Sequence, residues 1–190
     1  MGVALHKLSL AEFLTWEAEQ DGRHEFHSGE AFAMVGGRRG HSRIIANLVR
    51  HLGNHLDGSS CQVFSEGMKV RIGDDTVVYP DVFVTCDKRY RFDEQVITAP
   101  VLVVEVLSPA TQGYDRSAKF ASYRRLPSLR EYALIDPDTR RVEVFRPGDD
   151  EHWKLFDMST TAALELASVD ARIALSDVFQ GMDSGSEPDT

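Results

Sequence analysis

A carboxylic acid lies in the middle of an apolar segment of the chain. In PVLVVEVLSP, residues 100–109, Glu105 has valine or leucine on both sides. A strand this apolar is normally buried, and burying a carboxylate is costly unless it is ion-paired, hydrogen-bonded or bound to a metal. A second acid, Asp81, follows Pro80 in the segment VVYPDVFV. If the two segments are neighbouring strands, the carboxylates converge, and because they repel each other they need a cation or a shared proton.

The cation expected at this pair is Mg²⁺, with Mn²⁺ able to replace it. Mg²⁺ takes oxygen ligands and keeps several of its waters, which suits carboxylates on adjoining strands. The sequence therefore predicts a metal held by Asp81 and Glu105.

The segment after the Glu105 strand could add a positive charge. A helix is expected over residues 114–125, in which Asp115, Lys119 and Tyr123 are spaced i, i+4, i+8 and so share one face. Lys119 could orient or activate a water, or stabilise charge that develops on a phosphate. Two acids, a metal and a lysine would make a site for phosphodiester hydrolysis.

The elements that must position these side chains alternate between helical and strand-like patterns. Ser9 and Glu12 form the capping box of a short N-terminal helix, and a hairpin is expected around Ser28 and Gly29. A second helix begins near His41 and has apolar residues at helical spacing. Strand-like segments follow at residues 61–73, 76–86, 101–107, 129–147, 152–158 and 172–174, with a polar loop over residues 87–99. We predict an α/β (α+β) fold, a central mixed sheet flanked by helices, with an added N-terminal helix and β-hairpin.

Length and composition are those of an ordinary globular protein. The 190 residues suit one domain, which we place over residues 1–180, followed by an acidic segment, 181–190, that we expect to be disordered. No apolar run reaches the roughly 20 residues that a membrane-spanning helix needs. Cys61 and Cys86 make no disulfide framework and no metal-binding pattern, which favours a reduced, cytoplasmic location.

The charge of the chain limits how it could bind nucleic acid. A formal net charge of −9 argues against a protein whose main function is to bind nucleic acid. Basic residues nevertheless cluster at residues 38–39, 88–91 and 116–130. These patches could meet phosphates, although scattered surface charge explains each of them at least as well.

The segments YPDV, VLVVEVLSPAT, YDRSAKFASYRRL and REYALIDP, in this order, resemble the Uma-two family of endonuclease-like proteins. The resemblance also covers RHEFHSGEAFAM and the helix near His41, and it runs from about residue 8 to residue 179. That family belongs to the restriction-endonuclease-like superfamily, which carries the PD-(D/E)XK motif. The resemblance implies this fold and a Mg²⁺-dependent endonuclease that hydrolyses DNA, with Asp81 and Glu105 as the two motif acids.

The chain departs from the motif at one position. The motif lysine should stand two residues after the second acid, where this chain has Leu107. The resemblance implies that the lysine has moved to the following helix, as Lys119. It also points to Glu25 as an additional acid on the metal side, and to His41 as a residue that contacts phosphate or handles a proton.

Other interpretations stand beside these. Glu105 could be a structural acid paired with an arginine or capped by backbone amides, and Asp115 could be a first-turn helix acid or a partner of Lys119. Tyr123 could belong to the core. The chain could be a catalytically inactive nuclease-fold binding module, which Leu107 and the net charge favour, or a metal-dependent phosphoesterase with another substrate. For a DNA endonuclease we expect a homodimer, because duplex cleavage needs two cuts.

Overall fold

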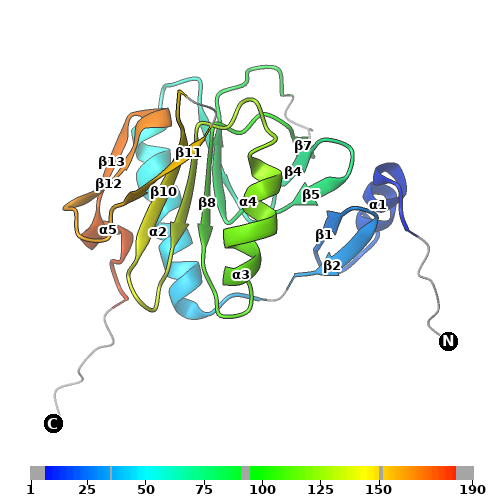
Figure 1. Ribbon diagram of the computed structural model, residues 1–190, viewed down its shortest axis with the longest axis horizontal. Coiled ribbons are helices and arrows are strands. Elements are labelled where there is room, and N and C mark those ends of the chain that lie inside the picture. The colour runs from blue at the N-terminus through cyan, green and yellow to red at the C-terminus, as the bar shows by residue number, and fades with distance from the viewer. Residues whose placement is uncertain (1–6, 35, 91–94, 150–151, 183–190) are drawn as a thin grey trace, which may run out of the picture.

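The computed structural model describes residues 7–34, 36–90, 95–149 and 152–182. Within these ranges the chain forms two larger β-sheets, a two-stranded sheet and several helices (Figure 1). The mixed α+β fold class predicted from the sequence is confirmed, although the strands divide between two sheets where the sequence suggested one. Most of the segment predicted to be disordered, from residue 183 onward, lies outside the described residues.

The six-stranded sheet has the order β11-β10-β9-β8-β6-β3. Its strands are β3 (Gln62–Ser65), β6 (Val82–Thr85), β8 (Leu102–Val106), β9 (Glu131–Ile135), β10 (Val142–Pro147) and β11 (Trp153–Asp157). Strands β8 and β9 are parallel and the other neighbours are antiparallel, so the sheet is mixed. Every residue of β8 is buried, as expected for a strand that is covered on both faces.

The five-stranded sheet has the order β2-β1-β5-β4-β7. Its strands are β1 (His24–His27), β2 (Glu30–Ala33), β4 (Lys69–Ile72), β5 (Thr76–Val78) and β7 (Val96–Ile97). The predicted hairpin between β1 and β2 is confirmed, and Ser28 and Gly29 turn it with φ of 50° and 93°. The prediction of a polar loop over residues 87–99 is wrong in part, because this segment contains β7, which pairs with β4 and buries Ile97.

Helix α1 (Leu10–Glu17) packs beside β1 at one end of the molecule (Figure 1). The predicted capping box is confirmed, since the Ser9 amide donates to Glu12 Oε2 at 2.7 Å and the Glu12 amide donates to Ser9 Oγ at 3.3 Å. The Phe13 ring stacks on that of Phe26 with centroids 4.8 Å apart. This contact joins the N-terminal helix to the strand that carries Glu25.

Helix α2 (Arg39–Leu56) covers one face of the six-stranded sheet (Figure 1). Its apolar positions follow the helical period, so Ile44, Leu48 and Leu52 lie on one side and are fully buried. They share a core cluster with Val104 of β8. The helix predicted from residue 41 therefore begins two residues earlier.

A helical segment over residues 112–123 covers the other face of the sheet. It consists of α3 (Gln112–Tyr114), a π-helical turn (Asp115–Lys119) and α4 (Phe120–Tyr123). The predicted range of 114–125 was two residues late at each end. A π-helical turn is rare and is often found at functional sites.

The C-terminal part adds a small sheet beside α2. Strands β12 (Ala163–Leu166) and β13 (Ala171–Ala174) flank a 3₁₀ turn (Ala167–Val169), and α5 (Leu175–Val178) follows. The sequence predicted β13 and the short helix after it but not β12. Among the residues that the structure describes, no helix is both long and apolar enough to span a membrane.

Cys61 and Cys86 are joined by a disulfide, so the prediction that the cysteines make no disulfide framework is wrong. Gln62 pairs with Thr85 across β3 and β6, which places the two cysteines at the next opposite positions. They are 25 residues apart in the sequence, and only the strand pairing brings them together. The reducing compartment inferred from unpaired cysteines therefore loses its basis.

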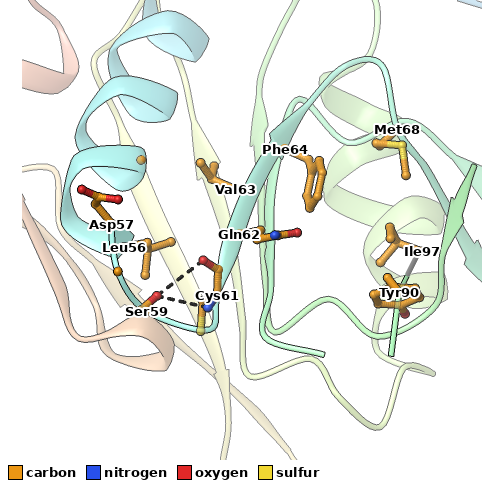
Figure 2. Close-up of a pocket in the computed structure, with 12 residues that line it drawn as sticks. Leu56, Asp57, Ser59, Cys61, Gln62, Val63, Phe64, Met68, Tyr90 and Ile97 are labelled. Atoms are coloured by element: carbon orange, nitrogen blue, oxygen red, sulfur yellow. Dashed lines mark hydrogen bonds between the residues drawn. The ribbon is translucent and has the colours of Figure 1, made fainter. Parts of the chain in front are cut away.

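A pocket of about 700 Å³ opens between β3 and β7, each at the edge of its sheet (Figure 2). Its lining includes Leu56, Phe64, Met68, Tyr90 and Ile97. None of the residues predicted for the hydrolytic site lines it. The pocket is therefore distinct from the predicted hydrolytic site.

Candidate functional site

The candidate site lies where the chain crosses from one larger sheet to the other. β5 belongs to the five-stranded sheet and β6 to the six-stranded sheet, and Asp81 is the last residue before β6. Val82 pairs with Val104 in the middle of β8, so Asp81 lies beside Glu105. The Asp81 amide donates to Glu105 Oε2 at 3.4 Å. The acids predicted to sit on neighbouring strands are therefore adjacent.

Lys119 reaches Glu105 from the helical segment that covers this face of the sheet. Its Nζ lies 3.0 Å from Glu105 Oε1 and 3.0 Å from Glu25 Oε1. Asp115 Oδ1 is 3.7 Å from the same nitrogen. Lys119 is only 7% exposed and Glu105 only 2%. One ammonium group is thus shared by three buried carboxylates.

Leu107, at the position of the motif lysine, lies on the same side of the sheet as Glu105 and the helical segment that carries Lys119. Residues two apart on a strand point to the same face, so Glu105 and Leu107 both face the helical segment. Leu107 is buried in an apolar cluster that includes Val103 and Tyr123. Leu107 therefore packs between the sheet and the helical segment, and Lys119 extends from the helical segment to Glu105.

Burial and neighbouring charge set the protonation of this group of residues. Burial lowers the pKa of Lys119, but the nearby carboxylates, led by Glu105 and Glu25, raise it well above its usual value. Burial raises the pKa of Glu105 well above its usual range, and Lys119 opposes this shift. Burial also raises the pKa of Asp115. The carboxylates therefore favour the protonated form of Lys119, against the effect of burial.

Asp81 is held on its other side by a backbone amide and a histidine. Its Oδ2 accepts a hydrogen bond from the Val106 amide at 2.7 Å and lies 3.2 Å from His41 Nε2. Burial lowers the pKa of His41, but the hydrogen bond with Asp81 and the charges of Asp81, Glu66 and Asp115 raise it above its usual value. His41, in the first turn of α2, therefore extends the site toward that helix.

Hydrogen bonds from two tyrosines hold the two glutamates. The Tyr123 hydroxyl donates to Glu105 Oε1 at 2.9 Å, so Tyr123 binds the acid as well as packing in the core. The Tyr79 amide donates to Glu25 Oε1 at 3.2 Å, and the Tyr79 hydroxyl donates to the buried Glu17 at 2.8 Å. The acids are thus fixed by contacts that the sequence did not reveal.

Replacing Tyr123 with phenylalanine removes one donor from Glu105 and leaves the ring in the core. Because the change leaves an oxygen of the buried Glu105 carboxyl group without this donor, we expect the free energy of unfolding to fall by about 1–3 kcal/mol. Urea denaturation followed by circular dichroism in EDTA would measure it. Tyr132→Phe is the matched control, because the Tyr132 hydroxyl donates to the uncharged backbone carbonyl of Asp115. This variant should lose about 1 kcal/mol of the free energy of unfolding. Equal losses would contradict a special role for the carboxylate.

Sequence reasoning missed Glu66, which lies just after β3. One oxygen of Glu66, one oxygen of Asp81 and one ring nitrogen of His41 all lie within 4.8 Å of one another. The only local signal is an acid followed by Gly67 at the end of a strand, which is common at turns. Such a signal could not have singled Glu66 out.

The structure brings together every residue that the sequence predicted for the site. These residues are Asp81, Glu105, Lys119, Glu25, His41 and Asp115. Among the residues that the structure describes, Glu105 pairs with Lys119 and not with an arginine, and the Asp81 amide donates to its carboxylate as the alternative of capping by backbone amides expected. The alternative in which Asp115 is a partner of Lys119 holds. Their catalytic roles stay predictions.

Comparisons with known proteins cover most of the chain. The model of the Uma2 family, described as "Putative restriction endonuclease", matches residues 10–176. Among the similar proteins is "Uncharacterized protein slr1290" of Synechocystis sp., 38% identical over 177 residues, which are 93% of this chain and 93% of that protein. "Uncharacterized protein sll1609" of the same organism is 33% identical over 164 residues, 84% of this chain and 93% of its own.

A solved structure is similar to this chain over nearly its whole length. It is the crystal structure described as "a putative nuclease belonging to DUF820" from Anabaena variabilis, with a TM-score of 0.77. The match covers 92% of this chain and 99% of that one, at 22% sequence identity. At this identity the likeness shows a shared fold.

Proposed function

Because this chain belongs to the Uma2 family, we propose that it is a metal-dependent endonuclease that hydrolyses phosphodiester bonds of DNA. The observation that carries the proposal is the contact between a lysine ammonium and one of two adjacent acids. Lys119 Nζ lies 3.0 Å from Glu105, whose carboxylate also accepts the Asp81 amide. The description of the family and the shared nuclease-like fold support the assignment to this class of hydrolase.

The donor set of the site fits a hard divalent cation. Asp81 and Glu105 offer carboxylate oxygens from adjoining strands, and oxygen is the ligand that Mg²⁺ and Mn²⁺ take. Asp81 and Glu105 would hold the ion, with Glu25 as a further acid. When bound, such an ion makes a water a stronger nucleophile and stabilises charge on the phosphate.

Lys119 would act through its charge. Because its pKa is well above the usual value, the amine keeps its proton, which favours orienting the attacking water and stabilising developing negative charge. Glu25 and Asp115 hold the ammonium group beside Glu105. His41, next to Asp81, would contact a phosphate or transfer a proton.

Basic groups near His41 offer local contacts for the DNA backbone. Arg38 and Arg39 are exposed at the start of α2, and the first turn of this helix has no acid and no side-chain cap. The amino end of a helix and arginine side chains both favour phosphate. With a net charge of −9, the chain must rely on such local contacts and on the metal.

Replacing Asp81 with asparagine should abolish cleavage of plasmid DNA in Mg²⁺ or Mn²⁺. The variant loses a charged metal ligand, yet its amide oxygen can still accept the Val106 amide, so the fold should persist. We expect a loss of at least about 10²-fold in rate, since changes around a metal cost this much even beyond its direct ligands. Conversion of supercoiled plasmid, with an EDTA control, measures it.

The matched control for this variant is Asp74→Asn, which removes the same charge from an exposed turn between β4 and β5. It should cleave like the wild type. Undiminished cleavage by the Asp81 variant would contradict the proposed metal role.

A catalytically inactive binding module is the second candidate. Leu107 at the motif position favours it, as do the contacts of Lys119, which go to acids of its own chain. This candidate requires no cleavage and no binding of divalent cations. Tight Mn²⁺ binding in calorimetry that is lost in Glu105→Gln would contradict it, and a panel of phosphoesters would separate a DNA endonuclease from another phosphoesterase.

The assembly is a further part of the proposal. A nuclease with one hydrolytic site must act twice to break both strands of a duplex, and a homodimer would supply two such sites. We therefore propose that the active form is a homodimer.

A further inference from the structure

Two segments that cross between the larger sheets lie side by side. One leaves β3 at Ser65 and passes through Glu66 and Gly67 to β4, and the other connects β5 to β6 and contains Asp81. The Glu66 amide donates to the Pro80 carbonyl at 3.1 Å, which ties the two segments together. Strand pairing on both sides of each crossing therefore fixes Glu66 close to Asp81.

Three different side chains that can bind metals meet at this point. His41 comes from α2, Glu66 from the turn after β3, and Asp81 from the residue before β6. One ligand atom from each lies within 4.8 Å of the other two, and all three side chains are half-buried. Small side-chain rotations would place these atoms around one ion.

The position of His41 depends on a glycine beside it. A Cβ added at Gly37 would lie 2.6 Å from His41 Nδ1, a distance that real Cβ atoms do not show. In the part of the chain that the structure describes, Nδ1 is buried and has no hydrogen-bond partner. A buried polar atom without a partner is rare and needs a reason. The ring therefore packs with its Nδ1 side against Gly37 and presents Nε2 to Asp81.

We propose that His41, Glu66 and Asp81 form a divalent-cation site that prefers a transition metal such as Mn²⁺ to Mg²⁺. The preference follows from the imidazole, because nitrogen ligands suit transition metals and Mg²⁺ favours oxygen alone. The inference rests on the proposed nuclease function to the extent that both use Asp81. It adds Glu66 and His41 as ligands, which the PD-(D/E)XK motif does not contain.

The contacts of Glu105 and Glu66 indicate that Glu105 pairs with Lys119 and that Glu66 is available to bind an ion. Glu105 is 2% exposed, and its Oε1 already faces the Lys119 ammonium and the Tyr123 hydroxyl. Glu66 is half-buried, and one of its carboxylate oxygens lies within 4.8 Å of ligand atoms of both His41 and Asp81. An ion at Asp81 can therefore gain Glu66 as a ligand without disturbing the ion pair between Glu105 and Lys119.

The test is a titration of the full chain with Mn²⁺, followed by electron paramagnetic resonance, and repeated in competition with Mg²⁺. Glu66→Gln keeps the shape of the side chain and should weaken Mn²⁺ binding by at least about tenfold. His41→Gln should weaken Mn²⁺ binding more than Mg²⁺ binding. Glu165→Gln removes the same charge from an exposed residue of β12 and should bind as the wild type does.

A pair of glycine variants tests the site without touching a ligand. Gly37→Ala should displace the His41 ring and weaken Mn²⁺ binding, whereas Gly36→Ala has nothing within 4 Å of the added carbon and should not. The ring resonances of His41 in an NMR spectrum of the metal-free protein should shift in the first variant alone. Thermal melts would verify that both variants fold.

The outcomes separate this inference from the proposed function. Unchanged Mn²⁺ affinity in both Glu66→Gln and His41→Gln would overturn the inference, even if the wild type cleaves DNA. Loss of affinity in these variants, with a wild type that cleaves no DNA, would support the cation site and contradict the nuclease. A stronger preference for Mg²⁺ than for Mn²⁺ in the wild type would overturn the proposed selectivity.

Discussion

Replacing Lys119 with methionine should both destabilise the protein and remove the proposed nuclease activity. Methionine fills the space of the lysine side chain, but it leaves Glu25, Glu105 and Asp115 facing one another without a cation. Breaking a buried ion pair by removing one partner typically costs about 3–5 kcal/mol. Loss of a charge that stabilises the transition state typically lowers the rate by about 10²–10³-fold.

Both effects can be measured separately. Urea denaturation in EDTA gives the free energy of unfolding, and plasmid cleavage at a temperature where the variant is folded gives the rate. Lys154→Met is the matched control, because Lys154 is exposed on β11 and should change stability by less than about 0.5 kcal/mol. In the Glu105→Gln background, Lys119→Met should lower the free energy of unfolding by less, because Lys119 has already lost its main charged partner. The same cost in both backgrounds would show that the ion pair does not matter.

Placing a lysine at the motif position, by Leu107→Lys, should be strongly destabilising in the wild type. Leu107 is 3% exposed in an apolar cluster, and the site already contains the ammonium group of Lys119. Burying a second charge there should cost several kcal/mol, by the order of magnitude found for single buried ions. Leu107→Met, which conserves volume, should cost less than about 1.5 kcal/mol.

The double variant Leu107→Lys/Lys119→Met tests whether the two lysine positions are equivalent. Leu107 and Glu105 face the same side of β8, so a lysine at 107 could replace the missing ammonium partner of Glu105. We therefore expect the double variant to be more stable than the sum of the single variants by about 1–3 kcal/mol. Simple additivity in urea denaturation would show that the chain depends on a lysine on the helix.

The sequence by itself was enough to find the acids and the lysine. Glu105 stands out because an acid in a run of valines must have a partner, and Asp81 because it precedes a second apolar strand. The spacing of Asp115, Lys119 and Tyr123 placed them on one helix face, and the structure shows two of the three in contact with Glu105. Local periodicity and the cost of burying charge led to these residues, and the resemblance to the Uma2 family added Glu25 and His41.

Only the tertiary structure decided what surrounds these residues. Glu66 meets Asp81 because two crossings between sheets are hydrogen-bonded to each other, and nothing near either residue in the sequence encodes that contact. Cys61 and Cys86 are paired because β3 lies beside β6, and the short strand β7 is defined by its pairing with β4, which buries Ile97. Strand order and register depend on contacts between residues distant in the chain. Periodicity along one segment can therefore show that a residue is buried, but not which residue it meets.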